Sequence, residues 1–90
     1  MAVHRRVAFL TRRNCSICGD ALADLKIPAF LFGIHLDVVD IDAEASEDTR
    51  ERYAGRVPVL LTDAGEVLAE GRMSKRKLWQ AARRARFRRS

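Results

Sequence analysis

With 90 residues, 48% of them hydrophobic, and only 5 glycines and 2 prolines, the chain has the composition of one folded domain, not of a disordered or collagen-like polymer. No apolar run approaches the roughly 18 residues of a membrane-spanning helix, and the start of the chain lacks the pattern of a secretory signal. The net charge of +5 is uneven: residues 72–90 carry nine basic and no acidic side chains, whereas residues 1–71 carry eight basic and twelve acidic ones. We expect a single cytoplasmic domain over residues 1–90, with an Arg-rich C-terminal helix and tail at 74–90.

The first predicted elements are a strand and a helix. Residues 3–11 end in a continuous apolar run, Val7 to Leu10, which is typical of a strand buried on both faces. After it the sequence changes to helical spacing, with Asn14 as the candidate N-cap and Pro28 as the expected end of the helix. Its apolar face carries Cys18, Leu22 and Leu25.

A second strand and a second helix follow. Residues 34–41 alternate apolar and polar side chains after Gly33, a pattern that predicts a strand. Residues 43–54 are polar, with acids early and arginines late, which suits a helix dipole, and Gly55 can form the C-terminal cap. This helix is expected to be short and mostly exposed.

The last part of the chain predicts a hairpin and a helix. Residues 56–62 and 66–70 flank a loop in which Gly65 can take a positive φ, so they predict an antiparallel pair, with Pro58 at a strand end or edge. Ser74 can cap a final helix whose apolar face carries Leu78, Ala82 and Ala85, with Trp79 beside them. The predicted order is β-α-β-α-β-β-α, an α/β domain.

The two cysteines are the main functional signal. Cys15 and Cys18 lie where the first strand gives way to a helix. The free N–H groups and positive dipole end of that helix, with Arg12 and Arg13 upstream, should lower the pKa of the Cys15 thiol below its usual value of about 8.5. Cys15 is therefore the candidate nucleophile. Cys18, one turn further on the same face, is the candidate resolving thiol.

Two other interpretations of the pair remain open. A zinc site would need two more ligands, and the candidates, His4 and His35, do not have the spacing of a second ligand pair. Both cysteines could also be ordinary core residues, because cysteine is among the most buried residue types. We favour redox chemistry and predict no metal ligands.

The sequence also resembles a known family. The segment Arg12 to Cys18 after a strand, followed by Arg56-Val57-Pro58-Val59-Leu60, resembles the glutaredoxin-like branch of the thioredoxin superfamily. Val39 to Asp42 and Tyr53 to Pro58 are similar to small glutaredoxin-like proteins in particular. The resemblance covers nearly the whole chain. It implies a thioredoxin-like fold, a four-stranded mixed sheet with helices on both faces.

The resemblance implies an activity and a substrate site. The protein would be an enzyme, a dithiol–disulfide oxidoreductase that reduces protein or mixed disulfides through Cys15 and Cys18. Pro58 would be cis and face the cysteines, the backbone of Val57 would bind the substrate as an added strand, and Arg12 would help to hold glutathione's carboxylate. No cofactor is obligatory, glutathione is a candidate co-substrate, and a reductase is the expected electron donor. We expect a monomer with neither nucleic acid nor a membrane as partner.

Some residues depart from the family's pattern. Ser16-Ile17 stands between the cysteines in place of a Pro-containing pair. Gly71 to Lys75 replaces an Asp-containing turn and is instead similar to the start of the last helix in bacterial thioredoxins. Its cations, Arg72 and Lys75, would repel the ammonium group of glutathione, so we expect a flavoprotein reductase or another thiol to be the better reductant. Two alternative functions are an iron–sulfur or zinc carrier using the same cysteines, and a module binding nucleic acid or an acidic partner through residues 72–90.

Overall fold

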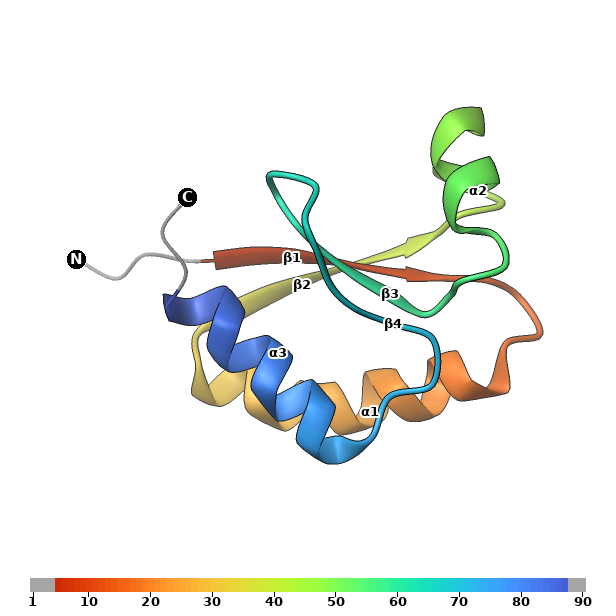
Figure 1. The fold of residues 1–90 in the computed structure, drawn as a ribbon. Helices are drawn as coiled ribbons and strands as arrows, with labels where there is room; N and C mark the ends of the chain where they lie inside the picture. The colour runs from red at the N-terminus through yellow and green to blue at the C-terminus, as the bar shows by residue number, and fades with distance from the viewer. Residues whose placement is uncertain (1–4, 88–90) are drawn as a thin grey trace.

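The computed structural model describes residues 5–87, without the side chain of Arg5, and builds them around one four-stranded sheet (Figure 1). The strands are β1 (Arg5–Thr11), β2 (Ile34–Asp40), β3 (Val59–Thr62) and β4 (Val67–Glu70), in the spatial order β2-β1-β3-β4. β1 pairs with β2 in parallel and with β3 in antiparallel orientation, and β3 and β4 form an antiparallel pair. The predicted mixed sheet is confirmed. Residues 3 and 4 of the predicted first strand, His4 among them, and tail residues 88–90 lie outside the described residues.

Helices cover both faces of this sheet. α1 (Ser16–Leu31) and α3 (Lys75–Phe87) pack against each other on one face, and α2 (Glu47–Tyr53) lies on the other side, beyond the end of β2 (Figure 1). The order β-α-β-α-β-β-α confirms the predicted thioredoxin-like α/β fold. Within residues 5–87, none of the three helices has the length and apolar character needed to span a bilayer.

The burial of β1 explains its continuous apolar run. Successive side chains of a strand point to opposite faces, so Val7 and Phe9 pack under α1 and α3, while Ala8 and Leu10 pack on the other face with Tyr53 of α2. Phe9 has no exposed surface. A strand that is covered on both sides needs apolar residues at every position, and this is the pattern that the sequence shows.

The bounds of α1 differ from those predicted at both ends. Asn14 is not the N-cap: it has a φ of +64° in the turn after β1, and Cys15 is the N-cap residue. Asparagine tolerates the left-handed region, which lets the chain reverse there. Pro28 does not end the helix, which runs to Leu31 with Pro28 inside it. The backbone bond that proline cannot make is offset by its burial, since Pro28 and the neighbouring Ala29 lie in the core.

The second helix is shorter than predicted. Residues 43–45 form turns, and α2 begins only after Ser46, whose hydroxyl accepts a hydrogen bond from the Thr49 N–H at 3.2 Å. This side-chain cap satisfies one free N–H group of the first turn, which defines where the helix begins. The C-cap residue is Ala54, not Gly55.

The hairpin and the start of the last helix agree with the prediction from the sequence. β3 and β4 are joined through a turn in which Gly65 has a φ of +86°, and Pro58 lies immediately before β3. The Ser74 hydroxyl accepts a hydrogen bond from the Lys77 N–H at 3.2 Å, as expected of an N-cap. α3 buries Leu78, Ala81, Ala82 and Ala85.

Candidate active site

The cysteine pair lies at the junction between β1 and α1. The two sulfur atoms form a disulfide, and the Cα atoms of Cys15 and Cys18 are 5.3 Å apart. Cys18 is one turn inside the helix and only 2% exposed, whereas Cys15 is partly exposed at the N-cap. Cys15 has an extended backbone (φ −106°) at the N-cap position, and its side chain makes no capping hydrogen bond to the free N–H groups of the first turn. An incoming reagent therefore reaches Cys15 before Cys18.

The loop before β3 borders the same surface. The Val57–Pro58 peptide bond is cis, as the family resemblance implied. Val57 and Cys15 line one open hollow of about 570 Å³, which Arg12, Arg13, Asn14, Ser16, Ile17 and Asp42 complete. Pro58 itself is buried. Within residues 5–87, no backbone–backbone hydrogen bond engages the N–H or C=O of Val57, so both groups are available to an extended segment beside Cys15.

Contacts of Gly71 and Arg56 hold this loop in place. The Gly71 N–H donates to the carbonyl oxygens of Arg56, at 3.1 Å, and of Pro58, at 2.8 Å, one on each side of Val57. The Arg56 guanidinium forms an ion pair with Glu70 and lies 5.1 Å from the centre of the Tyr53 ring. Contacts from Glu70 and Gly71, at the end of β4, thus fix the position of the Val57 backbone.

Replacing Gly71 by Ala should lower stability at this anchor. Gly71 has a φ of +70°, and the left-handed conformation costs a non-glycine residue about 1–2 kcal/mol. An added Cβ would meet no atom within 4 Å, so we expect only this backbone cost. Urea unfolding of Gly71→Ala measures it. Gly19→Ala is the matched control, because Gly19 is an exposed residue inside α1 where alanine should stabilise by about 0.5–1 kcal/mol. Equal effects of the two substitutions would contradict the argument.

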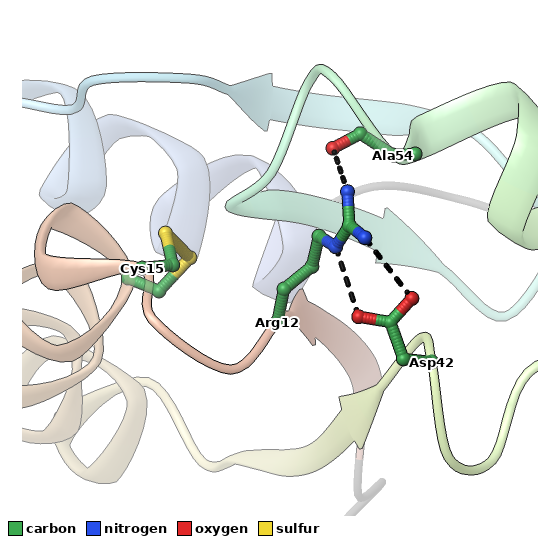
Figure 2. The surroundings of a disulfide bond; sticks show 5 residues. Arg12, Cys15, Asp42 and Ala54 are labelled. Carbon is green, nitrogen blue, oxygen red and sulfur yellow. Dashed lines mark hydrogen bonds and ion pairs between the residues drawn. A yellow bond between two sulfur atoms is a disulfide. The ribbon is translucent and has the colours of Figure 1, made fainter.

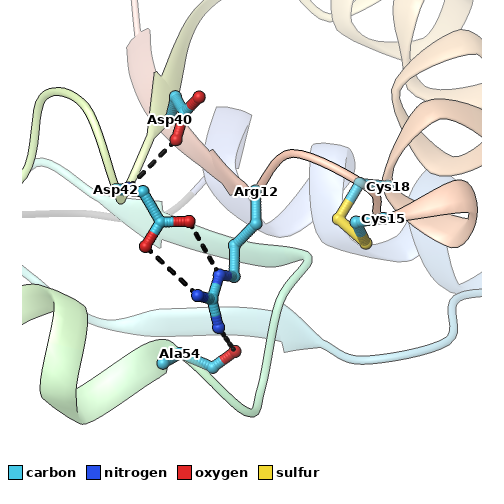
Figure 3. Close-up of polar contacts among 6 residues, drawn as sticks. All are labelled: Arg12, Cys15, Cys18, Asp40, Asp42 and Ala54. Carbon is cyan, nitrogen blue, oxygen red and sulfur yellow. Dashed lines mark hydrogen bonds and ion pairs between the residues drawn. A yellow bond between two sulfur atoms is a disulfide. The ribbon is translucent and has the colours of Figure 1, made fainter.

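Arg12 lies on the wall of the hollow, but its guanidinium already has protein partners. Nε and Nη2 donate to the two carboxylate oxygens of Asp42 at 2.9 and 3.2 Å, and Nη1 donates to the carbonyl of Ala54 at 3.2 Å. Figures 2 and 3 show the guanidinium turned toward these two groups and away from the disulfide. The side chains of Arg12 and Asp42 are both 39% exposed, so solvent and ligands can reach the pair.

Asp42 is a site residue that the sequence reasoning did not single out. Its N–H donates to the Asp40 carboxylate at 3.0 Å, which fixes the turn after β2 (Figure 3). A signal was available: β1 and β2 are parallel with Thr11 opposite Asp40, and the carboxyl ends of parallel strands meet at one sheet edge. A basic residue after one strand and an acidic residue after the next can therefore meet.

A second, smaller hollow of about 140 Å³ lies beside the first turns of α1. Asp20 and Asp24 line it together with Arg72, Ile17, Ala21 and Met73. The turn that begins at Gly71 thus has two carboxylates beside its cation. An ammonium group that entered this hollow would therefore meet the carboxylates of Asp20 and Asp24 as well as the Arg72 cation, and the expectation from sequence included only the cation.

The predicted histidine candidates do not join the cysteines in the described part of the chain. His35 is the second residue of β2 and lies 3.2 Å from Asp37, near the start of the strand, whereas the cysteines follow the end of β1. Among residues 5–87, no three side chains of the metal-binding types His, Cys, Asp and Glu come together. His4 lies outside the described residues.

Together, the mixed sheet, the cysteine pair at the start of α1 and the cis-proline loop beside it define a small thioredoxin-like domain. Residues 6–82 match the family described as "Glutaredoxin-like domain (DUF836)", so the chain belongs to the glutaredoxin-like family. No curated protein matches it. One solved structure, described as "Structure of a malarial protein", is 19% identical with a TM-score of 0.60, and the match covers 92% of this chain and 98% of that one. That likeness shows the fold alone.

Proposed function

We propose that the protein is a thiol–disulfide oxidoreductase that reduces protein or mixed disulfides. The observation that carries the proposal is the Cys15–Cys18 disulfide at an open hollow bordered by Val57. A structural disulfide would be buried or would tie distant segments together. This one joins residues three apart and leaves one cysteine accessible. A reducing compartment such as the cytoplasm would return it to the dithiol form.

The reaction runs in two exchange steps. In the reduced protein, the Cys15 thiolate attacks one sulfur of the substrate disulfide. That bond breaks, a Cys15–substrate mixed disulfide forms, and the departing thiolate takes up a proton. Cys18, deprotonated, then attacks the Cys15 sulfur and releases the second substrate thiol. Two electrons and two protons pass to the substrate, and the protein is left with the Cys15–Cys18 disulfide seen here. An external reductant restores the dithiol.

The loop gives the substrate its orientation in this proposal. The N–H and C=O groups of Val57 bind an extended substrate segment as an added strand, and buried Pro58 keeps the loop beside Cys15. Arg12 and Arg13 supply positive charge at the same hollow. Because Asp42 and Ala54 already hold Arg12, a substrate carboxylate has to compete with Asp42 for the guanidinium.

A stoichiometric exchange experiment tests the function. Reduced protein is mixed with a disulfide-linked peptide, and we expect peptide thiols to appear while the protein loses the mass of two hydrogen atoms and gains the Cys15–Cys18 bond. Absence of exchange would overturn the proposal. An absorption spectrum of protein purified without oxygen checks the carrier alternative, because an iron–sulfur cluster absorbs visible light and a dithiol does not.

A further inference from the structure

Exposed hydrophobic side chains gather away from the cysteines. Within residues 5–87, six large hydrophobic side chains are exposed, and five of them lie on the last two turns of α1 or on α3. Phe30 is 83% exposed and Phe87 is 68% exposed. With the partly buried Phe32 they form what we call the apolar cluster: Ile27, Phe30, Leu31, Phe32, Trp79 and Phe87. Phe30 lies about 20 Å along α1 from Cys15.

Ring contacts link the residue that follows α1 to α3. Phe32, just after α1, meets the ring of Trp79 edge-on at a centroid distance of 6.1 Å and the ring of Phe87 at 6.3 Å. α1 and α3 pack side by side on the same face of the sheet (Figure 1). On α1, Ile27, Phe30 and Leu31 are spaced so that they share one helix face.

Basic side chains of α3 lie beside the aromatic residues of the cluster. Trp79, Arg83 and Phe87 are four residues apart in α3, so an exposed arginine lies between two aromatic rings along the helix. Arg83, Arg84, Gln80 and Phe87 line an open hollow of about 580 Å³. Arg84 is 3.5 Å from Glu66, and the acidic residues of α1, Asp20 and Asp24, precede Ile27, the first cluster residue of that helix. Residues 72–90 contain no acid.

We propose that the apolar cluster and these basic side chains dock the domain on an anionic phospholipid surface. Aromatic and aliphatic side chains enter the interface while arginine and lysine remain at the phosphate level, which is how peripheral helices bind such membranes. A second copy is disfavoured, because it would bring two basic α3 helices together. The projecting rings favour a bilayer over an acidic protein, because a protein partner would need a pocket shaped to each ring. The expectation of no membrane partner considered only long apolar segments, and this surface is assembled from two helices.

Trp79 is the only tryptophan in the chain and lies in the cluster, so its fluorescence reports directly on docking. We expect a blue shift of its emission and co-sedimentation with vesicles of phosphatidylcholine mixed with phosphatidylserine. Neither effect is expected with phosphatidylcholine alone, and added salt should weaken both. The double variant Phe30→Gln/Phe87→Gln should bind at least about tenfold more weakly. Arg83→Glu should also weaken binding about tenfold.

Control variants show whether vesicle binding depends on the apolar cluster and on Arg83. Val38→Gln removes the sixth exposed hydrophobic side chain, which lies on β2, and Arg52→Glu makes the same charge change on α2; both should bind like the unchanged protein. The cluster variants should still reduce disulfides, because the cluster lies away from Cys15. Absence of vesicle binding, or binding that the double variant leaves unchanged, overturns the proposal. A dimer in light scattering that Phe30→Gln/Phe87→Gln dissociates would assign the surface to a second copy instead.

Discussion

Replacing Cys15 by Ser should reduce disulfide exchange to the uncatalysed rate, whereas Cys18→Ser should still attack a substrate and accumulate as a mixed disulfide. The reason is the difference in access: Cys15 lines the open hollow at the helix start, and Cys18 is 2% exposed beneath it. Without Cys18, the mixed disulfide is resolved only when another thiol, such as glutathione, attacks it. Turnover on a disulfide peptide and mass spectrometry of the trapped adduct measure the two effects.

The control for this pair is Ala64→Ser, which introduces a serine at an exposed position of the β3–β4 turn, outside the hollow, and should retain activity. Circular dichroism of all three variants shows whether the fold is kept. The assignment of the two thiols is reversed if Cys15→Ser forms a stable adduct through Cys18 and both thiols are alkylated at similar rates.

Turnover with glutathione should be poor in the unchanged protein and should improve when Asp42 is replaced by Asn. The Asp42 carboxylate holds two N–H groups of Arg12 and occupies the position where a substrate carboxylate would bind this guanidinium. It also repels an incoming carboxylate, by an energy of order 1 kcal/mol or more at contact distance. Asp42→Asn removes this charge and keeps the shape of the side chain. We expect KM for glutathione to fall about fivefold to tenfold, with little change in kcat.

The assay compares turnover of a glutathionylated peptide with two reductants: glutathione plus its own reductase, and a thioredoxin reductase system. Asp63→Asn is the matched control, because Asp63 is an exposed residue in the β3–β4 turn at the far end of β3. Efficient, saturable turnover of the unchanged protein with glutathione alone would contradict the expected preference for another reductant. An unchanged KM for glutathione in Asp42→Asn would show that Asp42 is not the cause of the poor turnover with glutathione.

Local patterns predicted the elements because their causes are local. The unbroken run from Val7 to Leu10 indicates a strand covered on both faces, and Ser74 begins α3 through its own hydroxyl. The cysteine pair was identified in the same way, since a strand followed by a helix places Cys15 at a helix start. The predicted end of the first helix at Pro28 was wrong, because burial of Pro28 in the core offsets a lost backbone bond and no local pattern reports that burial.

The sequence by itself determined the β-α-β-α-β-β-α order and the position of the cysteine pair between a strand and a helix, because periodicity, capping residues and turn glycines act within a few residues. The tertiary structure decided which distant groups meet. It paired Arg12 with Asp42 and Ala54, and it bonded the Gly71 N–H to the carbonyls on either side of Val57. It also brought the aromatic side chains after α1 and on α3 together. These contacts depend on strand register and helix packing, which bring together residues far apart in the chain, and periodicity within a single element carries no information about them.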